Sequence, residues 1–104
     1  MSTLPADPAG ARPTDPATAE AALILTRADE LAAISSRSDA LERVHLSPEH
    51  ARANALVAEW MTASGLSTWR DAAGNQWGRL EGSSPGLPAL ILGSHIDTVP
   101  DAGR

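Results

Sequence analysis

A histidine and an aspartate two positions apart, His95 and Asp97, are the residues of this sequence whose types and spacing best suit chemistry. An imidazole nitrogen is a common ligand of divalent metal ions, and a metal-bound imidazole usually donates its other ring N–H to a carboxylate or a carbonyl group. The pair therefore indicates a metal site in which His95 is a ligand and Asp97 orients the ring. The alternative is a histidine at a strand end beside a turn-forming aspartate, without any metal.

The residues just before this pair indicate how the fold would position it. Residues 89–92 are Ala-Leu-Ile-Leu, between Pro88 and Gly93. Such a short apolar run predicts a strand buried on both faces, as in the centre of a parallel sheet. His95 would then follow the carboxyl end of the strand. Ligands of open α/β sheets bind in the crevice outside these ends, so the predicted strand places His95 where chemistry is commonly done.

Two amphipathic helices are predicted ahead of the strand. Apolar residues at three- and four-residue spacing predict one helix over residues 19–36 and a second over residues 48–64. The second helix has strong end signals, with Ser47 as N-cap, Pro48 at the first helical position and Gly65 as a left-handed stop.

A hairpin is predicted between the second helix and the apolar run. Its strands would cover residues 67–70 and 76–80, joined by residues 71–75, whose Asp, Gly and Asn are turn-forming types. Trp69 and Trp77 would then be neighbours across the two strands.

The remaining large or titratable residues are assigned ordinary structural roles. Trp60 and Met61 fall on the apolar face of the second helix and are expected in the core. His50 lies in the first turn, on the side opposite that face, and His45 lies in a linker. We predict that both histidines are structural or solvent-exposed, and that neither converges on His95.

Charge and composition exclude several classes of function. The 104 residues carry a formal net charge of −5, and all eight basic residues are arginines without a cluster, which argues against a nucleic-acid partner. The absence of cysteine excludes disulfides and thiolate metal sites, and leaves imidazole and carboxylate groups as ligands. The sequence has neither a signal-peptide pattern nor an apolar run long enough for a membrane span, so we expect a cytoplasmic protein that does not contact a membrane.

The chain has room for one small domain at most. Residues 1–18 combine several prolines with small residues, so we expect a disordered tail there. Residues 19–104 would form part of an α/β domain, made of two helices, a hairpin and one central strand.

The residues around His95 resemble a known family. Residues 93–104, Gly-Ser-His-Ile-Asp-Thr-Val-Pro-Asp-Ala-Gly-Arg, closely resemble the first metal-binding segment of the hydantoinase/carbamoylase family of amidases, which includes N-carbamoyl-L-amino-acid hydrolases and allantoate amidohydrolases. Residues 46–50, 60–66 and 71–75 with 78–80 resemble further blocks of that family, in the same order. Several ordered blocks are more specific than one motif, and the resemblance covers about residues 40–104.

The resemblance implies a metal-dependent hydrolase of linear, non-peptide C–N bonds, built on a metallopeptidase-like three-layer α/β/α catalytic domain. It implies two divalent ions (Zn, Mn or Co), a small ureido or carbamoyl substrate and a homodimer for the complete enzyme. His95 matches the family's first metal ligand, and Asp97 matches the acid that orients it. Residues 101–104 favour allantoate as substrate, with an N-carbamoyl-L-amino acid as the alternative. A non-catalytic remnant or small binding protein is the alternative of another class.

The family's remaining site residues have no counterpart in these 104 residues. Its bridging aspartate would follow almost immediately after Arg104, and its paired glutamates and later histidines would lie further on. We therefore expect an N-terminal fragment of the catalytic domain, inactive alone, because a dinuclear site needs several ligands and this sequence has one.

Overall fold

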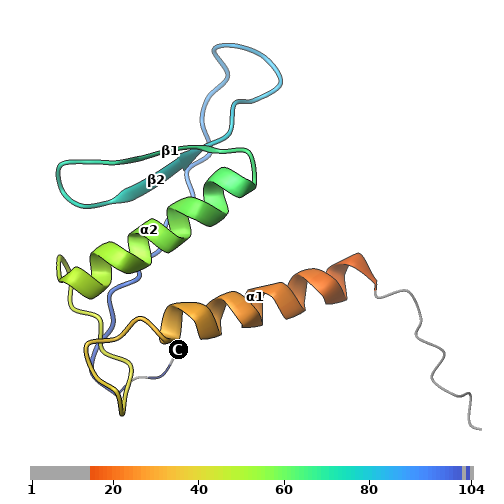
Figure 1. Cartoon of the computed structure of the whole chain (residues 1–104). Helices are drawn as coiled ribbons and strands as arrows, with labels where there is room; N and C mark the ends of the chain where they lie inside the picture. The colour runs from red at the N-terminus through yellow and green to blue at the C-terminus, as the bar shows by residue number, and fades with distance from the viewer. Residues whose placement is uncertain (1–14, 102, 104) are drawn as a thin grey trace, which may run out of the picture.

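The computed structural model describes residues 15–101 and residue 103. In chain order the elements are α1 (Pro16–Ala32), α2 (Pro48–Ala63), β1 (Ser67–Arg70) and β2 (Gln76–Arg79). The two strands lie along α2, α1 projects to one side, and the last described segment runs back past α2 toward the end of α1 (Figure 1). The chain is thus a small mixed α/β piece. No described helix combines the length and apolar character that a membrane crossing requires.

Helix α1 begins three residues before the predicted start and ends four residues before the predicted end. Proline is compatible with the first helical position because the N–H it lacks would have no partner there, so Pro16 begins the helix where the sequence predicted a disordered tail. Residues 1–14 of that predicted tail lie outside the described residues. The Ser35 hydroxyl donates to the carbonyl of Ala40 and accepts from the backbone N–H of Glu42, which diverts the chain after Ala32.

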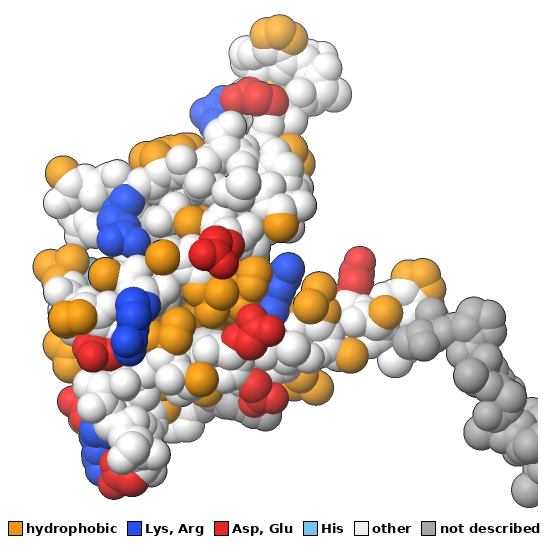
Figure 2. All heavy atoms as spheres, viewed as in Figure 1, with side chains coloured by type: hydrophobic (Ala, Val, Ile, Leu, Met, Phe, Trp, Pro, Cys, Tyr) orange, Lys and Arg blue, Asp and Glu red, His pale blue; other side chains and the backbone are white. Residues whose placement is uncertain are grey.

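Helix α2 confirms the end signals in the sequence. The Ser47 hydroxyl accepts from the backbone N–H of His50 at 3.1 Å, Pro48 is the first helical residue, and Gly65 follows the helix with φ of 88°. Trp60 and Met61 lie half-buried rather than in a closed core. Hydrophobic side chains gather between α1 and α2 (Figure 2).

The predicted hairpin is confirmed, with β2 one residue shorter than expected. Trp69 pairs directly with Trp77, and their rings stack with centroids 5.9 Å apart and planes within 4°. The hairpin approaches α2 closely at Gly78, where an added Cβ would lie 2.7 Å from the sulfur of Met61. A side chain at this position would therefore separate the hairpin from the helix.

The predicted central strand is not formed among the described residues. Residues 89–92 pair with no other described segment, and the sheet consists of β1 and β2 alone. Leu90 and Leu92 are 86% and 87% exposed, where the sequence predicted burial on both faces. A central strand requires hydrogen-bonded neighbours on both sides, and no described strand lies beside this run. The predicted three-layer domain is therefore not confirmed.

The hairpin loop should carry a measurable pH dependence. Hydrogen bonds to Asp71 from the Trp77 indole, and then from Asn75, lower the pKa of its carboxyl from 3.8 to about 2. A lowered folded-state pKa stabilises the fold above pH 3.8, and the contribution is lost as the pH falls from 3.8 to about 2. Asp71→Asn should lower the melting temperature at pH 7, with the difference from the native chain shrinking below pH 3.8. The exciton circular-dichroism signal of Trp69 and Trp77 reports the thermal transition, and Glu20→Gln on α1 is the control. A difference in melting temperature between Asp71→Asn and the native chain that does not change with pH would contradict the prediction.

The exposed apolar run should make the chain self-associate. Extended backbone with unpaired N–H and C=O groups and apolar side chains recruits a second chain. At about 50 μM the native chain should sediment as an oligomer, and Leu90→Lys combined with Leu92→Lys should shift it toward monomer. The control is Leu25→Lys, at an exposed leucine on α1. A native monomer at that concentration would contradict the prediction.

Candidate functional site

The predicted pair His95 and Asp97 lies in direct hydrogen-bond contact. Nδ1 of His95 is 2.9 Å from the backbone oxygen of Asp97 and 3.2 Å from its carboxylate Oδ1. A backbone carbonyl oxygen can only accept a hydrogen bond, so Nδ1 must carry a proton to make this contact. The neutral ring then keeps its lone pair on Nε2, and the side chain is 80% exposed. The imidazole is thus held in the tautomer that offers Nε2 to a ligand.

The segment that carries the pair is tied to the linker between the two helices. The backbone N–H of Arg43 donates to the Thr98 hydroxyl at 2.9 Å, and the N–H of Thr98 donates to the Arg43 carbonyl at 2.9 Å. This pairing brings residues more than fifty positions apart in the sequence together beside Asp97. No role was predicted for Arg43, because a single arginine in a linker carries no local signal that it is buried.

The other two histidines line the same cavity as the pair. His45, His50, His95 and Asp97 all line one cavity of about 450 Å³. His50 is only 5% exposed, which corrects its predicted place opposite the apolar face. Its Nδ1 accepts from the backbone N–H of Leu46 at 3.2 Å, and its ring meets that of His45 edge-on with centroids 4.9 Å apart.

The two histidines differ in environment. Burial, and then the neighbouring His45, lower the pKa of His50, which favours the neutral form of its ring. His50 accepts a hydrogen bond from the backbone at the start of α2, whereas the side chain of His45 is exposed. Their structural and exposed roles match the prediction from the sequence.

A metal ion would find one oriented ligand in this part of the chain. His95 fits a divalent ion that prefers imidazole and carboxylate donors, because its Nε2 is free and its Nδ1 is held by acceptors. Among residues 15–101 and 103, however, no three His, Cys, Asp or Glu side chains converge to hold an ion. The ligand role of His95 and the orienting role of Asp97 therefore remain predictions.

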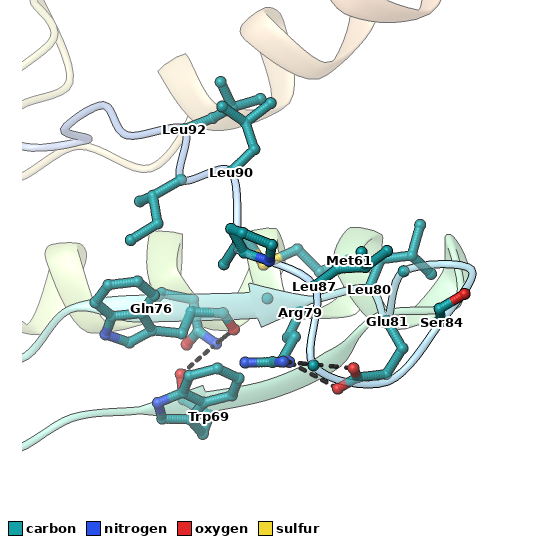
Figure 3. Close-up of a pocket in the computed structure, with 17 residues that line it drawn as sticks. Met61, Trp69, Gln76, Arg79, Leu80, Glu81, Ser84, Leu87, Leu90 and Leu92 are labelled. Atoms are coloured by element: carbon teal, nitrogen blue, oxygen red, sulfur yellow. Dashed lines mark hydrogen bonds and ion pairs between the residues drawn. The ribbon is translucent and has the colours of Figure 1, made fainter.

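A second cavity, of about 490 Å³, adjoins the first and shares Met61, Gln76 and Leu92 with it. Its lining comes from the hairpin, including Trp69 and Gln76, and from the segment that carries Leu87, Leu90 and Leu92 (Figure 3). His95 and Asp97 are not among the residues that line it. It is the hollow beside the uncovered apolar run, and it contains no group of the predicted site.

Comparison with known proteins finds relatives that carry the names of hydrolases. The chain is 47% identical over 79 residues to "Allantoate deiminase 2" of Glycine max, which is 76% of this chain and 16% of that protein. It is 42% identical over 77 residues to "N-carbamoyl-L-amino-acid amidohydrolase" of Pseudomonas sp. (strain NS671), which is 73% of this chain and 19% of that protein. It is 38% identical over 77 residues to "Ureidoglycolate hydrolase" of Arabidopsis thaliana.

These matches confirm the resemblance recognised in the sequence, although the chain spans only about a sixth of the length of the curated relatives that it matches. No family model and no solved structure matches the chain.

The carboxylate of Asp97 should control how well His95 binds an ion. Asp97→Asn removes the charge that supports the Nδ1 proton, and the loss of such a partner costs roughly 10- to 100-fold in metal affinity. Titration of the chain with Zn²⁺, followed by the NMR signals of the His95 ring, measures the effect. His95→Ala should abolish these signals, and Asp101→Asn, at an exposed carboxylate four residues further on, is the matched control. Equal affinity in Asp97→Asn and the native chain would make Asp97 a turn residue only.

Proposed function

Because the chain is related over about three quarters of its length to allantoate deiminases and N-carbamoyl-L-amino-acid amidohydrolases, we propose that it carries part of the metal site of an amidohydrolase that cleaves linear, non-peptide C–N bonds. His95 is the proposed ligand, and Asp97 is the acid that orients it. The observation that carries the proposal is the hydrogen bonding of the His95 ring, which leaves Nε2 available in an exposed position.

The proposed chemistry assigns one task to each residue. A divalent ion at such a site supplies Lewis-acid chemistry, activating water and polarising the carbonyl group of an amide or ureide. His95 binds through Nε2, while Asp97 keeps the proton on Nδ1 and fixes the plane of the ring. The proposal includes a pair of Zn, Mn or Co ions and a homodimer for the whole enzyme in the cytoplasm. It assigns neither the other ligands nor the general base.

Allantoate is the proposed substrate. The relatives named for it share up to 48% identity with this chain, against 42% for the relatives named for N-carbamoyl-L-amino acids. Residues 101–104 support the same choice from the sequence. An N-carbamoyl-L-amino acid is the second candidate, because both groups of relatives cover nearly the same share of the chain. The two substrates share the ureido group that would be hydrolysed.

Segment exchange tests the proposed function directly. The 79 matched residues of the Glycine max allantoate deiminase are replaced by those of this chain, and ammonia release from allantoate is measured with Mn²⁺. The hybrid enzyme should be active, because the replaced segment contains the proposed ligand and its orienting acid. His95→Ala in the hybrid should reduce activity by more than the roughly 10- to 100-fold expected for Asp97→Asn. Glu59→Gln, at an exposed residue of α2, is the control.

The same assay separates the alternatives. A hybrid that folds but hydrolyses neither allantoate nor an N-carbamoyl-L-amino acid would contradict the proposal and favour a non-catalytic binding protein. The same segment can also be exchanged into the Pseudomonas amidohydrolase. If that hybrid is active while the allantoate deiminase hybrid is inactive, an N-carbamoyl-L-amino acid would be the substrate in place of allantoate. The 104-residue chain alone should release no ammonia with any of the three metals, and turnover abolished by His95→Ala would contradict that expectation.

A further inference from the structure

A buried arginine joins the three segments that meet beside the His95 and Asp97 pair. The side chain of Arg43 is bonded to three backbone carbonyls, and the residue is only 4% exposed. Its Nε donates to the carbonyl of Ile96 at 2.7 Å, and its Nη1 donates to the carbonyls of Leu31 at 2.6 Å and Ile34 at 2.7 Å. The guanidinium therefore links the carboxyl end of α1 to the residue that lies between His95 and Asp97.

Burial of this charge is costly, and the carbonyls offset the cost. Burial lowers the pKa of the Arg43 guanidinium, and the charge of Asp97 acts in the opposite direction. Within the described part of the chain, no carboxylate lies within salt-bridge distance of Arg43. The guanidinium is instead hydrogen-bonded to carbonyl oxygens, one of which, that of Leu31, lies in the last turn of α1, where the helix dipole is negative. A planar fork with donors on separate nitrogens can reach both sides of this junction, whereas a single ammonium group cannot.

We propose that Arg43 is a positioning residue for His95 and Asp97. By holding the carbonyl of Ile96, Arg43 fixes the backbone between the two residues. The backbone oxygen and Oδ1 of Asp97 can then both reach Nδ1 of His95. This inference rests on the proposed function only in calling His95 a metal ligand; the orientation of the ring can be measured without any activity. A role confined to stability would leave the His95 tautomer and its ion affinity unchanged in molecules that remain folded.

The test uses the full chain with Arg43→Gln and Arg43→Lys. Circular dichroism follows folding, and long-range ¹H–¹⁵N NMR of His95 at alkaline pH reports which ring nitrogen carries the proton. Titration with Zn²⁺ alone reports affinity. Arg43→Gln should lower the population protonated at Nδ1 and weaken Zn²⁺ binding about tenfold, the lower end of the effect of losing an orienting partner. Arg43→Lys should not restore either property, because its one nitrogen cannot bridge Leu31 and Ile96. The matched control is Arg79→Gln, at an exposed arginine paired with Glu81.

Each outcome decides the inference. An Arg43→Gln chain that stays folded with native tautomer and Zn²⁺ affinity would overturn it, and so would rescue by Arg43→Lys. If Arg43→Gln does not fold, Arg43→Lys decides, because it keeps a positive charge at the buried position but its one nitrogen cannot bridge Leu31 and Ile96. Native tautomer and Zn²⁺ affinity in folded Arg43→Lys would then overturn the inference. A shifted tautomer together with an inactive hybrid enzyme would retain the role of Arg43 and reject the proposed function.

Discussion

A shortage of apolar core is the constraint on which the described structure depends. Among residues 15–101 and 103, Ala53 is the sole hydrophobic side chain that is fully buried, whereas three polar or charged residues are buried: Arg43, His50 and Asn54. Burying polar groups is favourable only when they are hydrogen-bonded, and each of these three has a backbone partner. The segments are therefore held together largely by side chains that bond to backbone carbonyls and N–H groups.

This form of stabilisation explains why α1 is less firmly attached than the unit formed by α2 and the hairpin. The hairpin is stabilised internally by the stacked Trp69 and Trp77, and it packs closely on α2 at Gly78, with hydrogen bonds from Asn54 to the carbonyl of Gly74 and from Arg70 to the carbonyl of Ala51. Helix α1 has a less extensive attachment: Arg27 lies over the ring of Trp60 at 5.0 Å, and Arg43 bonds to the carbonyl of Leu31 in the last turn of the helix and to that of Ile34 just beyond it. The position of α1 therefore depends on a few directional contacts. One of them, the Arg43 guanidinium, also holds the segment that carries His95 and Asp97.

Features encoded by neighbouring residues could be predicted from the sequence, and features that depend on distant residues could not. Ser47, Pro48 and Gly65 specify the ends of α2 through contacts within a few positions, so that helix was predicted to within one residue. The strand over residues 89–92 needed partners that no described segment supplies. For the site, the contact between His95 and Asp97 spans two residues and was predicted, whereas the partners of Arg43 lie 9, 12 and 53 residues away and were missed.

The geometry of the site follows from combining a local and a distant restraint. Hydrogen bonds between residues two positions apart define which nitrogen of His95 is free, but they do not define where that nitrogen points relative to the rest of the fold. The bond from Arg43 to Ile96 adds that second restraint, and it does so through the end of α1. A ligand held by both restraints loses little freedom when an ion binds, which favours a preorganised site.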